Sequence, residues 1–193
     1  GAIKALIARF PEVAIIGNKK TFPILYNYFG VDSNIIEINE DSIIDLGKHQ
    51  LKFFLTPMLH WPETMMTYET NTKVLFSGDA FGSFGTLDGG IFDDEVILDD
   101  YEEEVRRYYS NIVGKYWNPV QKAFEKLSGT DINIIAATHG PVWRSNKEWI
   151  LSRYQKWSKF EADGGLLIVF GSMYGNTEKV AEAAQFIDSY NKE

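Results

Sequence analysis

The chain has 193 residues, a hydrophobic content of 45% and a formal net charge of −8 at pH 7. This length and hydrophobicity are enough to bury a substantial core. The acidic balance disfavours nonspecific binding to nucleic acid or to anionic membranes. Because the chain has no cysteine, disulfides, thiolate zinc sites, cysteine-bound iron–sulfur clusters and cysteine nucleophiles are excluded, and any metal must be held by histidine and carboxylate.

Targeting signals are not evident in the sequence. No stretch approaches the ~20 apolar residues of a membrane helix, and the N-terminus lacks the charged-then-apolar pattern of a signal peptide. We therefore expect a cytoplasmic protein. The chain starts at Gly1, directly in a helical pattern, and we expect that residues upstream of it were removed.

The first thirty residues predict helix, strand and helix. Apolar residues recur at helical spacing over residues 3–10, and Pro11 ends that helix. Residues 13–16 read as a short buried strand. A second helix begins at Thr21, which can cap it, and ends before Gly30.

The next part of the chain predicts short strands and a long loop. Turn-like residues at 45–48 and 70–73 separate β-rich runs, which predicts two antiparallel hairpins. The expected strands are 35–38, 42–45, 50–55, 65–69 and 74–77. Residues 78–100 are rich in glycine and aspartate and are predicted to form a functional or covering loop.

The remaining elements are predicted by periodicity and by glycine-rich breaks. Helices are expected over 101–113, 119–127 and 146–160, and a buried strand over 132–137. Residues 161–165 are the expected linker. After it come a buried strand at 166–170, a Gly/Ser loop at 171–176 and a helix from Thr177.

Three side chains suited to metal binding come after apolar runs: His60, Asp79 and His139. Loops at strand ends often carry function, imidazole suits iron and zinc, and a carboxylate between two metals can bridge them. Each residue also has a purely structural interpretation, since His60 and His139 can be ordinary core or surface histidines and Asp79 can form an Asx turn. His49, beside a hairpin turn, is predicted to be solvated.

The stretches PMLHWPETMMTY, LFSGDAFGSFG and THGPVWR closely resemble the metallo-β-lactamase-like domain of the flavodiiron proteins, also called A-type flavoproteins. The order His60, Asp79, His139, with separations of 19 and 60 residues, matches the second half of that family's ligand set. The resemblance implies that His60 binds one iron, His139 the other, and Asp79 bridges them. The opening residues resemble the segment directly after the family's His-x-Glu-x-Asp-His motif, so the other ligands are expected upstream of Gly1.

A second resemblance lies near the C-terminus. The stretch LLIVFGSMYGNTEKVAEAA is similar to the start of a flavodoxin-like domain, where a loop between strand and helix holds the phosphate of FMN. By itself a Gly/Ser loop is more often a plain turn. The residues that the resemblance assigns to FMN are Ser172, Met173, Tyr174, Gly175, Asn176 and Thr177.

The resemblance implies an α/β fold of the αββα metallo-β-lactamase type with its N-terminal half missing. Residues 1–163 would be the C-terminal part of the di-iron domain, and residues 164–193 the incomplete start of a flavodoxin-like FMN domain. Without half of the fold, one sheet is expected to expose apolar surface or unpaired edges.

The implied function is an oxidoreductase that reduces dioxygen to water, nitric oxide to nitrous oxide, or both. Electrons would pass from a rubredoxin-like or other donor to FMN and then to the di-iron site of the partner subunit in a homodimer. No catalytic residue beyond the metal ligands is implied. With half of the ligands, this chain alone is expected to be inactive.

Two alternatives stay open. One is a zinc hydrolase on the same fold, in which a metal-bound hydroxide attacks an ester, thioester or lactam. The other is a non-catalytic fragment or partner. Aromatic residues near the ligands (Trp61, Phe81, Phe84 and Trp143) are expected to pack around the site, and the acidic runs 93–95 and 99–104 to form a solvated face.

Overall fold

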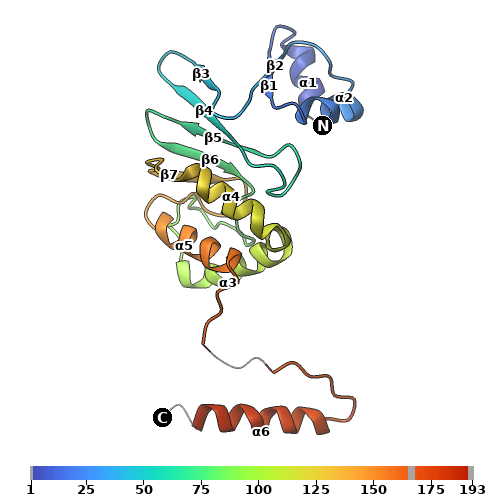
Figure 1. Cartoon of the computed structure of the whole chain (residues 1–193), viewed down its shortest axis with the longest axis vertical. Coiled ribbons are helices and arrows are strands. Elements are labelled where there is room, and N and C mark those ends of the chain that lie inside the picture. Colours follow the sequence, from blue (N-terminus) through green and yellow to red (C-terminus); the bar gives the residue numbers. More distant parts are fainter. Residues whose placement is uncertain (1, 165–167, 191–193) are drawn as a thin grey trace. The chain divides into compact units, whose positions relative to one another are not determined.

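The computed structural model describes residues 2–164 and 168–190. The chain divides into two compact units, residues 1–161 and 162–193, which are described separately. Figure 1 traces the elements. The helices are α1 (Ala2–Arg9), α2 (Thr21–Phe29), α3 (Leu98–Tyr108), α4 (Trp117–Leu127), α5 (Lys147–Ser158) and α6 (Asn176–Tyr190). The strands are β1 (Ile15–Gly17), β2 (Ile35–Glu37), β3 (Ile43–Asp45), β4 (Gln50–Leu55), β5 (Met65–Glu69), β6 (Val74–Gly78) and β7 (Ile134–Ala137).

The first unit is built around a five-stranded sheet in the order β3-β4-β5-β6-β7. Its first four strands pair antiparallel, which confirms the two predicted hairpins. β7 pairs parallel to β6. Because β4, β6 and β7 run in the same direction, their C-terminal ends lie at one edge of the sheet.

One face of this sheet is covered by helices, with α4 and α5 against it (Figure 1). Side chains of successive strand residues point to opposite faces, and β6 shows the consequence: Leu75 is fully buried, whereas Phe76 is 50% exposed. The core joins sheet residues to helix residues. Phe76 therefore points to the sheet face opposite to that of Leu75.

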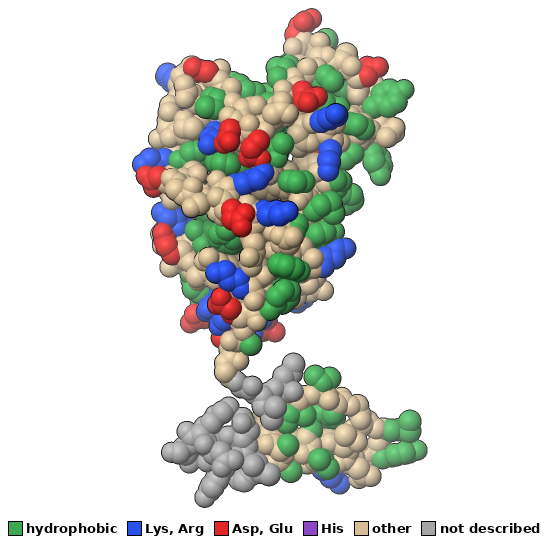
Figure 2. Space-filling model, viewed as in Figure 1, with side chains coloured by type: hydrophobic (Ala, Val, Ile, Leu, Met, Phe, Trp, Pro, Cys, Tyr) green, Lys and Arg blue, Asp and Glu red, His purple; other side chains and the backbone are tan. Residues whose placement is uncertain are grey.

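The N-terminal elements of the first unit include a separate two-stranded sheet. β1 and β2 pair parallel, and α2 ends at Gly30, whose φ of 65° is the left-handed conformation that glycine adopts at helix C-termini. Residues of β2 are exposed. On the face drawn in Figure 2, hydrophobic side chains are intermixed with acidic and basic ones.

The predicted helix over 101–113 is wrong in its bounds. α3 begins at Leu98 and ends at Tyr108, and a π-helical turn (Tyr109–Val113) and a 3₁₀ turn (Gly114–Tyr116) connect it to α4. The π turn buries Tyr109 and Val113 in the core. Packing of these two apolar side chains, which helical periodicity alone does not encode, accounts for the local change of helix type.

The second unit contains α6, as the sequence predicts. The strand predicted over 166–170 is not formed in its described part: residues 168–170 are irregular, and residues 166 and 167 lie outside the described residues. A strand requires a hydrogen-bonded neighbour, and no strand pairing among the described residues includes this segment. No described helix is both long and apolar enough to cross a membrane.

Glu69, at the end of β5, organises the β5–β6 hairpin. Its carboxylate accepts hydrogen bonds from the backbone N–H groups of Asn71 and Thr72 and from the Thr72 hydroxyl. His49 Nδ1 lies 3.3 Å from it. The hydrogen bond from the Thr72 side chain, followed by the backbone hydrogen bonds, lowers the pKa of Glu69 to about 2.

This lowered pKa predicts how stability depends on pH. The contribution of the Glu69 carboxylate is fully present above about pH 4.5 and is lost as the pH falls towards about 2, because the folded state holds the charged form. We expect Glu69→Gln to lower the free energy of unfolding near neutral pH and to flatten its decline below pH 4.5. Urea unfolding as a function of pH measures this. The exposed Glu12→Gln is the control, and an acid profile of Glu69→Gln parallel to that of the unsubstituted protein would refute the prediction.

Candidate metal centre

His60 lies in the loop between β4 and β5. Backbone hydrogen bonds close this loop on itself, from Thr56 N to Thr64 O at 3.0 Å and from Met58 N to Trp61 O at 2.7 Å. Leu59 is buried in the core and anchors the residue before His60. The imidazole is thereby held at the sheet edge where β4 ends.

Asp79 comes directly after β6. Gly78 takes a φ of +63°, a conformation that glycine adopts without steric cost, and so turns the chain out of the strand. Ser77 donates a hydrogen bond from its hydroxyl to Ala80 O at 2.7 Å. Ala80 and Phe81 are buried, so the backbone on both sides of Asp79 is anchored, while its side chain is 32% exposed.

His139 lies just beyond β7 at the same edge. Thr138 N donates to Gly78 O at 2.8 Å, and Ser83 N donates to His139 O at 3.3 Å. The backbone on either side of His139 is thus tied to the segment that carries Asp79. The next residue, Gly140, has a φ of +77°.

The structure brings the three predicted ligands together around the Asp79 carboxylate. His60 Nε2 lies 3.1 Å from Asp79 Oδ2, and His139 Nε2 lies 3.5 Å from Asp79 Oδ1. Each carboxylate oxygen therefore faces a different imidazole. A carboxylate that bridges two cations uses its two oxygens in this way.

The donor set fits half of a two-metal site. With Asp79 as a bridge, each ion would have one imidazole nitrogen and one carboxylate oxygen, fewer than the four or more donors that such ions take. Within residues 2–164 and 168–190, no cluster of three or more potential donors able to hold one metal ion occurs. His49 is not part of this centre, since it pairs with Glu69.

Tyrosines that the sequence patterns did not single out surround the ligands. The ring of Tyr108, at the end of α3, lies 5.9 Å from that of His139, and the ring of Tyr116 lies 6.2 Å from that of His60. Burial, and then the nearby charge of Asp79, raise the pKa of Tyr108 well above its usual value, so its hydroxyl keeps its proton. No local pattern distinguishes Tyr108 from a core residue.

Three of the four aromatic residues that the sequence analysis singled out lie as expected. Trp143 and Phe81 are buried, and Trp143 Nε1 donates to Phe81 O at 2.8 Å. Phe84 packs edge-on against Tyr108. Trp61 differs, since it is exposed beside His60.

The acidic run 93–95 forms the solvated face that the sequence predicts only in part, since Asp94 and Glu95 are exposed but Asp93 is not. Asp93 is only 1% exposed, and its carboxylate accepts hydrogen bonds from the backbone N–H groups of residues 144–146. Asp94 is partly exposed and binds the Arg144 guanidinium. Burial of Asp93 is tolerated because those N–H groups replace water.

The candidate FMN loop belongs to the second unit. Ser172, Met173 and Tyr174 are exposed, and Gly175, with a φ of +76°, leads into α6. The first turn of α6 starts at Asn176 and Thr177, so its free N–H groups are available to an anion. These six residues are contiguous in an exposed turn at a helix N-terminus.

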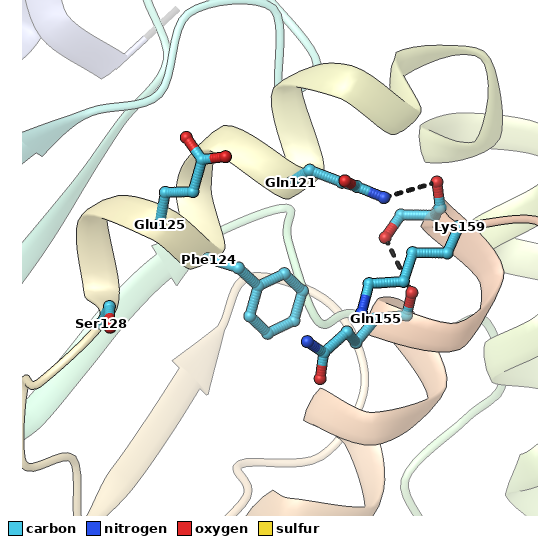
Figure 3. A pocket seen from close by; sticks show the side chains of 7 residues that line it. Gln121, Phe124, Glu125, Ser128, Gln155 and Lys159 are labelled. Carbon is cyan, nitrogen blue, oxygen red and sulfur yellow. Dashed lines mark hydrogen bonds between the residues drawn. The ribbon is translucent and has the colours of Figure 1, made fainter.

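A pocket at the seam of α4 and α5 does not involve the predicted ligands. It is lined by Gln121, Phe124, Glu125, Ser128, Gln155, Ser158 and Lys159. Figure 3 shows Phe124 between the two helices and the hydrogen bond from Gln121 to Ser158 O. The seam joins two helices by direct contacts, and none of its residues is part of the metal centre.

Gly140 gives a test of the packing beneath His139. A Cβ at Gly140 would lie 2.1 Å from Ser83 Oγ, whereas Gly129, with a similar φ of +78°, has nothing within 4 Å. Both Gly→Ala changes carry the left-handed backbone cost of about 1–2 kcal/mol. We expect Gly140→Ala to cost about 1–3 kcal/mol more than Gly129→Ala, because of the added overlap. Equal losses of unfolding free energy in urea titrations would contradict the close packing of Gly140 on Ser83.

Comparison with known proteins places the chain in a family. Residues 1–140 match the model described as ODP family beta lactamase. The chain is 35% identical over 188 residues to the anaerobic nitric oxide reductase flavorubredoxin of Escherichia coli O1:K1 / APEC, an alignment that covers 95% of the chain and 39% of that protein.

Solved structures agree on the fold. The flavodiiron protein from Giardia intestinalis matches with a TM-score of 0.86 at 29% identity, over 94% of this chain and 45% of that one. The rubredoxin oxygen:oxidoreductase from Desulfovibrio gigas matches with a TM-score of 0.84 at 28% identity, over 94% and 46%. The chain thus spans less than half the length of these relatives. The predicted α/β fold with a β-lactamase-like domain is confirmed, and this protein belongs to the ODP family of β-lactamase-like domains, whose members here are flavorubredoxins and flavodiiron proteins.

Proposed function

We propose that this chain is part of a flavodiiron oxidoreductase that reduces nitric oxide, dioxygen or both at a pair of iron ions. The single observation that carries the proposal is the Asp79 carboxylate, whose two oxygens face two different imidazoles at 3.1 and 3.5 Å. The relatives named nitric oxide reductase and rubredoxin oxygen:oxidoreductase support the reaction class. The reduction requires redox-active metal, which histidine and carboxylate ligands suit.

In this proposal the three residues have separate roles. His60 and His139 each hold one ion through Nε2, and Asp79 holds the two ions together. Bound iron would supply the electrons for reduction of the substrate. The remaining donors come from another segment or another chain, because this chain offers two donors per ion.

The neighbouring aromatic residues shape this site without binding metal. Tyr108, kept protonated by burial and by the Asp79 charge, which raise its pKa, presents a phenol near the His139 edge. The ring of Tyr116 lies 6.2 Å from the His60 ring and restricts its orientation, whereas Trp61 lies beside the same ring but is exposed. An imidazole held in one orientation is better prepared to bind metal.

The loop of residues 172–177 is proposed to bind the phosphate of FMN, the flavin that would pass electrons to the iron. Free N–H groups at the start of α6 and the hydroxyls of Ser172 and Thr177 are suitable donors. On this proposal residues 1–163 belong to the di-iron domain and residues 164–193 begin a flavodoxin-like domain. A homodimer, a rubredoxin-like donor, a cytoplasmic location and inactivity of this chain alone all remain predictions.

Metal binding tests the role of Asp79. We expect Asp79→Ala to abolish cobalt or iron binding at both positions, since it removes the shared ligand. His60→Ala and His139→Ala should each weaken chiefly one position, by more than the about 10–100-fold that is typical of residues that only orient a ligand. Metal titration of the holoenzyme that contains this chain, read by the cobalt visible spectrum, measures this. The matched control is His49→Ala, which removes a histidine outside the site.

Activity assays of the holoenzyme distinguish a reductase from a hydrolase. Iron-loaded protein in a holoenzyme that contains this chain should consume nitric oxide or dioxygen when supplied with reduced FMN. Zinc content with esterase activity and no oxygen or nitric oxide uptake would instead identify a hydrolase and overturn the proposal. Unchanged metal binding by Asp79→Ala would overturn the assigned site.

Flavin binding tests the loop of residues 172–177. We expect the holoenzyme to bind FMN more tightly than riboflavin, because only FMN carries the phosphate. Thr177→Val should reduce that preference by about tenfold, the equivalent of one hydrogen bond to a charged group. Fluorescence titration with both flavins measures the ratio. Ser152→Ala, which removes a hydroxyl from α5, serves as the control. Equal affinity for FMN and riboflavin in the unsubstituted protein would contradict the assignment.

A further inference from the structure

Asp93 is a buried carboxylate that the proposed function does not use. Its Oδ1 accepts hydrogen bonds from the backbone N–H groups of Arg144 at 2.7 Å and Ser145 at 3.1 Å. Its Oδ2 accepts from the backbone N–H of Asn146 at 2.5 Å and from Asn146 Nδ2 at 2.9 Å. A buried carboxylate with four donors is held in one position, because leaving those groups unpaired is costly.

The two loops joined by Asp93 both begin at a metal-ligand candidate. The loop from Asp79 leads to Asp93, and the loop from His139 leads to residues 144–146. Asp93 N also donates to Val142 O at 3.0 Å, and Val142 N donates to Ile91 O at 2.7 Å. The Asp93 carboxylate and these two backbone hydrogen bonds therefore join the ends of the two loops that lie farthest from the metal-ligand candidates.

The His139 side chain depends on this closure for its position. It is 54% exposed, and the ring of Tyr108 lies 5.9 Å from its ring. The backbone N–H of Ser83 donates a hydrogen bond to His139 O at 3.3 Å. Ser83 lies in the loop that runs from Asp79 to Asp93. Loosening that loop would move His139 relative to Asp79.

We propose that Asp93 is a positioning residue for the metal centre. By latching the loop after Asp79 to the loop after His139, it keeps the His139 imidazole at the distance from the Asp79 carboxylate that a shared metal site requires. This inference rests on the proposed function. The competing role is structural only: Asn146 precedes α5 without a side-chain cap of its own, and Asp93 would then serve only as a distant helix cap.

Three variants of the chain separate these roles. Asp93→Ala removes all four acceptor contacts. Asp93→Asn keeps one acceptor oxygen and is the milder variant should Asp93→Ala fail to fold. The matched control on the same loop is Asp94→Asn, which alters a partly exposed carboxylate bound to the Arg144 side chain.

A fourth variant controls for loss of stability. Leu127→Ala truncates a buried residue at the end of α4, away from both loops. Its unfolding free energy is measured in urea beside those of the Asp93 variants, so that effects at the site are compared at similar stability.

The first readout is the dissociation constant of Co²⁺ alone, measured in the holoenzyme that contains this chain. We expect Asp93→Ala to raise it by about 10-fold or more, the effect typical of residues that orient metal ligands, and Asp93→Asn to give an intermediate increase. Asp94→Asn and Leu127→Ala should leave it unchanged. An unchanged constant in Asp93→Ala would overturn the positioning role and leave the helix-cap role.

The second readout needs no metal. Amide hydrogen exchange at Ser83, whose N–H bonds to His139 O, should accelerate in Asp93→Ala and not in Leu127→Ala. If the unsubstituted protein bound no Co²⁺, the proposed metal function would fail, while Ser83 exchange would still decide whether Asp93 latches the loops. If exchange at Ser83 accelerated equally in Asp93→Ala and Leu127→Ala, in proportion to their loss of global stability, the role of Asp93 in joining the two loops would be refuted.

Discussion

The parallel pairing of β6 with β7 is the contact on which the candidate metal centre depends. It aligns Gly78 with Ala137, so the chain leaves both strands at the same sheet edge, where Asp79 and His139 lie within two residues of the strand ends. These residues are 60 positions apart in sequence. β4 runs in the same direction two strands away, and the loop after it adds His60. Without the β6–β7 register, the carboxylate would not face two imidazoles.

Two features of the first unit bear on its family assignment. The donor set supplies one imidazole and a shared carboxylate to each proposed ion. The sheet buries one face against α4 and α5 and leaves Phe76 of the other face half exposed. Both features fit the ODP family assignment, because a site at the edge of a β-lactamase-like sheet draws ligands from several loops.

Much of the fold could be predicted from sequence because the signals are local. Alternating and helical periodicities placed the strands of the hairpins and α1, α2 and α5 within a few residues. The π turn at Tyr109–Val113 escaped prediction, since tertiary packing of two side chains overrides helical regularity there. Residues 168–170 did not form the expected strand, because apolar character favours a strand but only a pairing partner makes one.

The amino-acid sequence alone limited the kinds of metal ligand available. It contains no cysteine and so no thiolate, and it places His60, Asp79 and His139 after apolar runs. Folding established which oxygen of Asp79 faces which imidazole, and it alone revealed Tyr108 beside His139. It also buried Asp93 while leaving Asp94 to bind Arg144 near the surface. The two adjacent carboxylates look alike in sequence. Burial of Asp93 depends on N–H groups about 51 residues away, which only the packed chain brings to it.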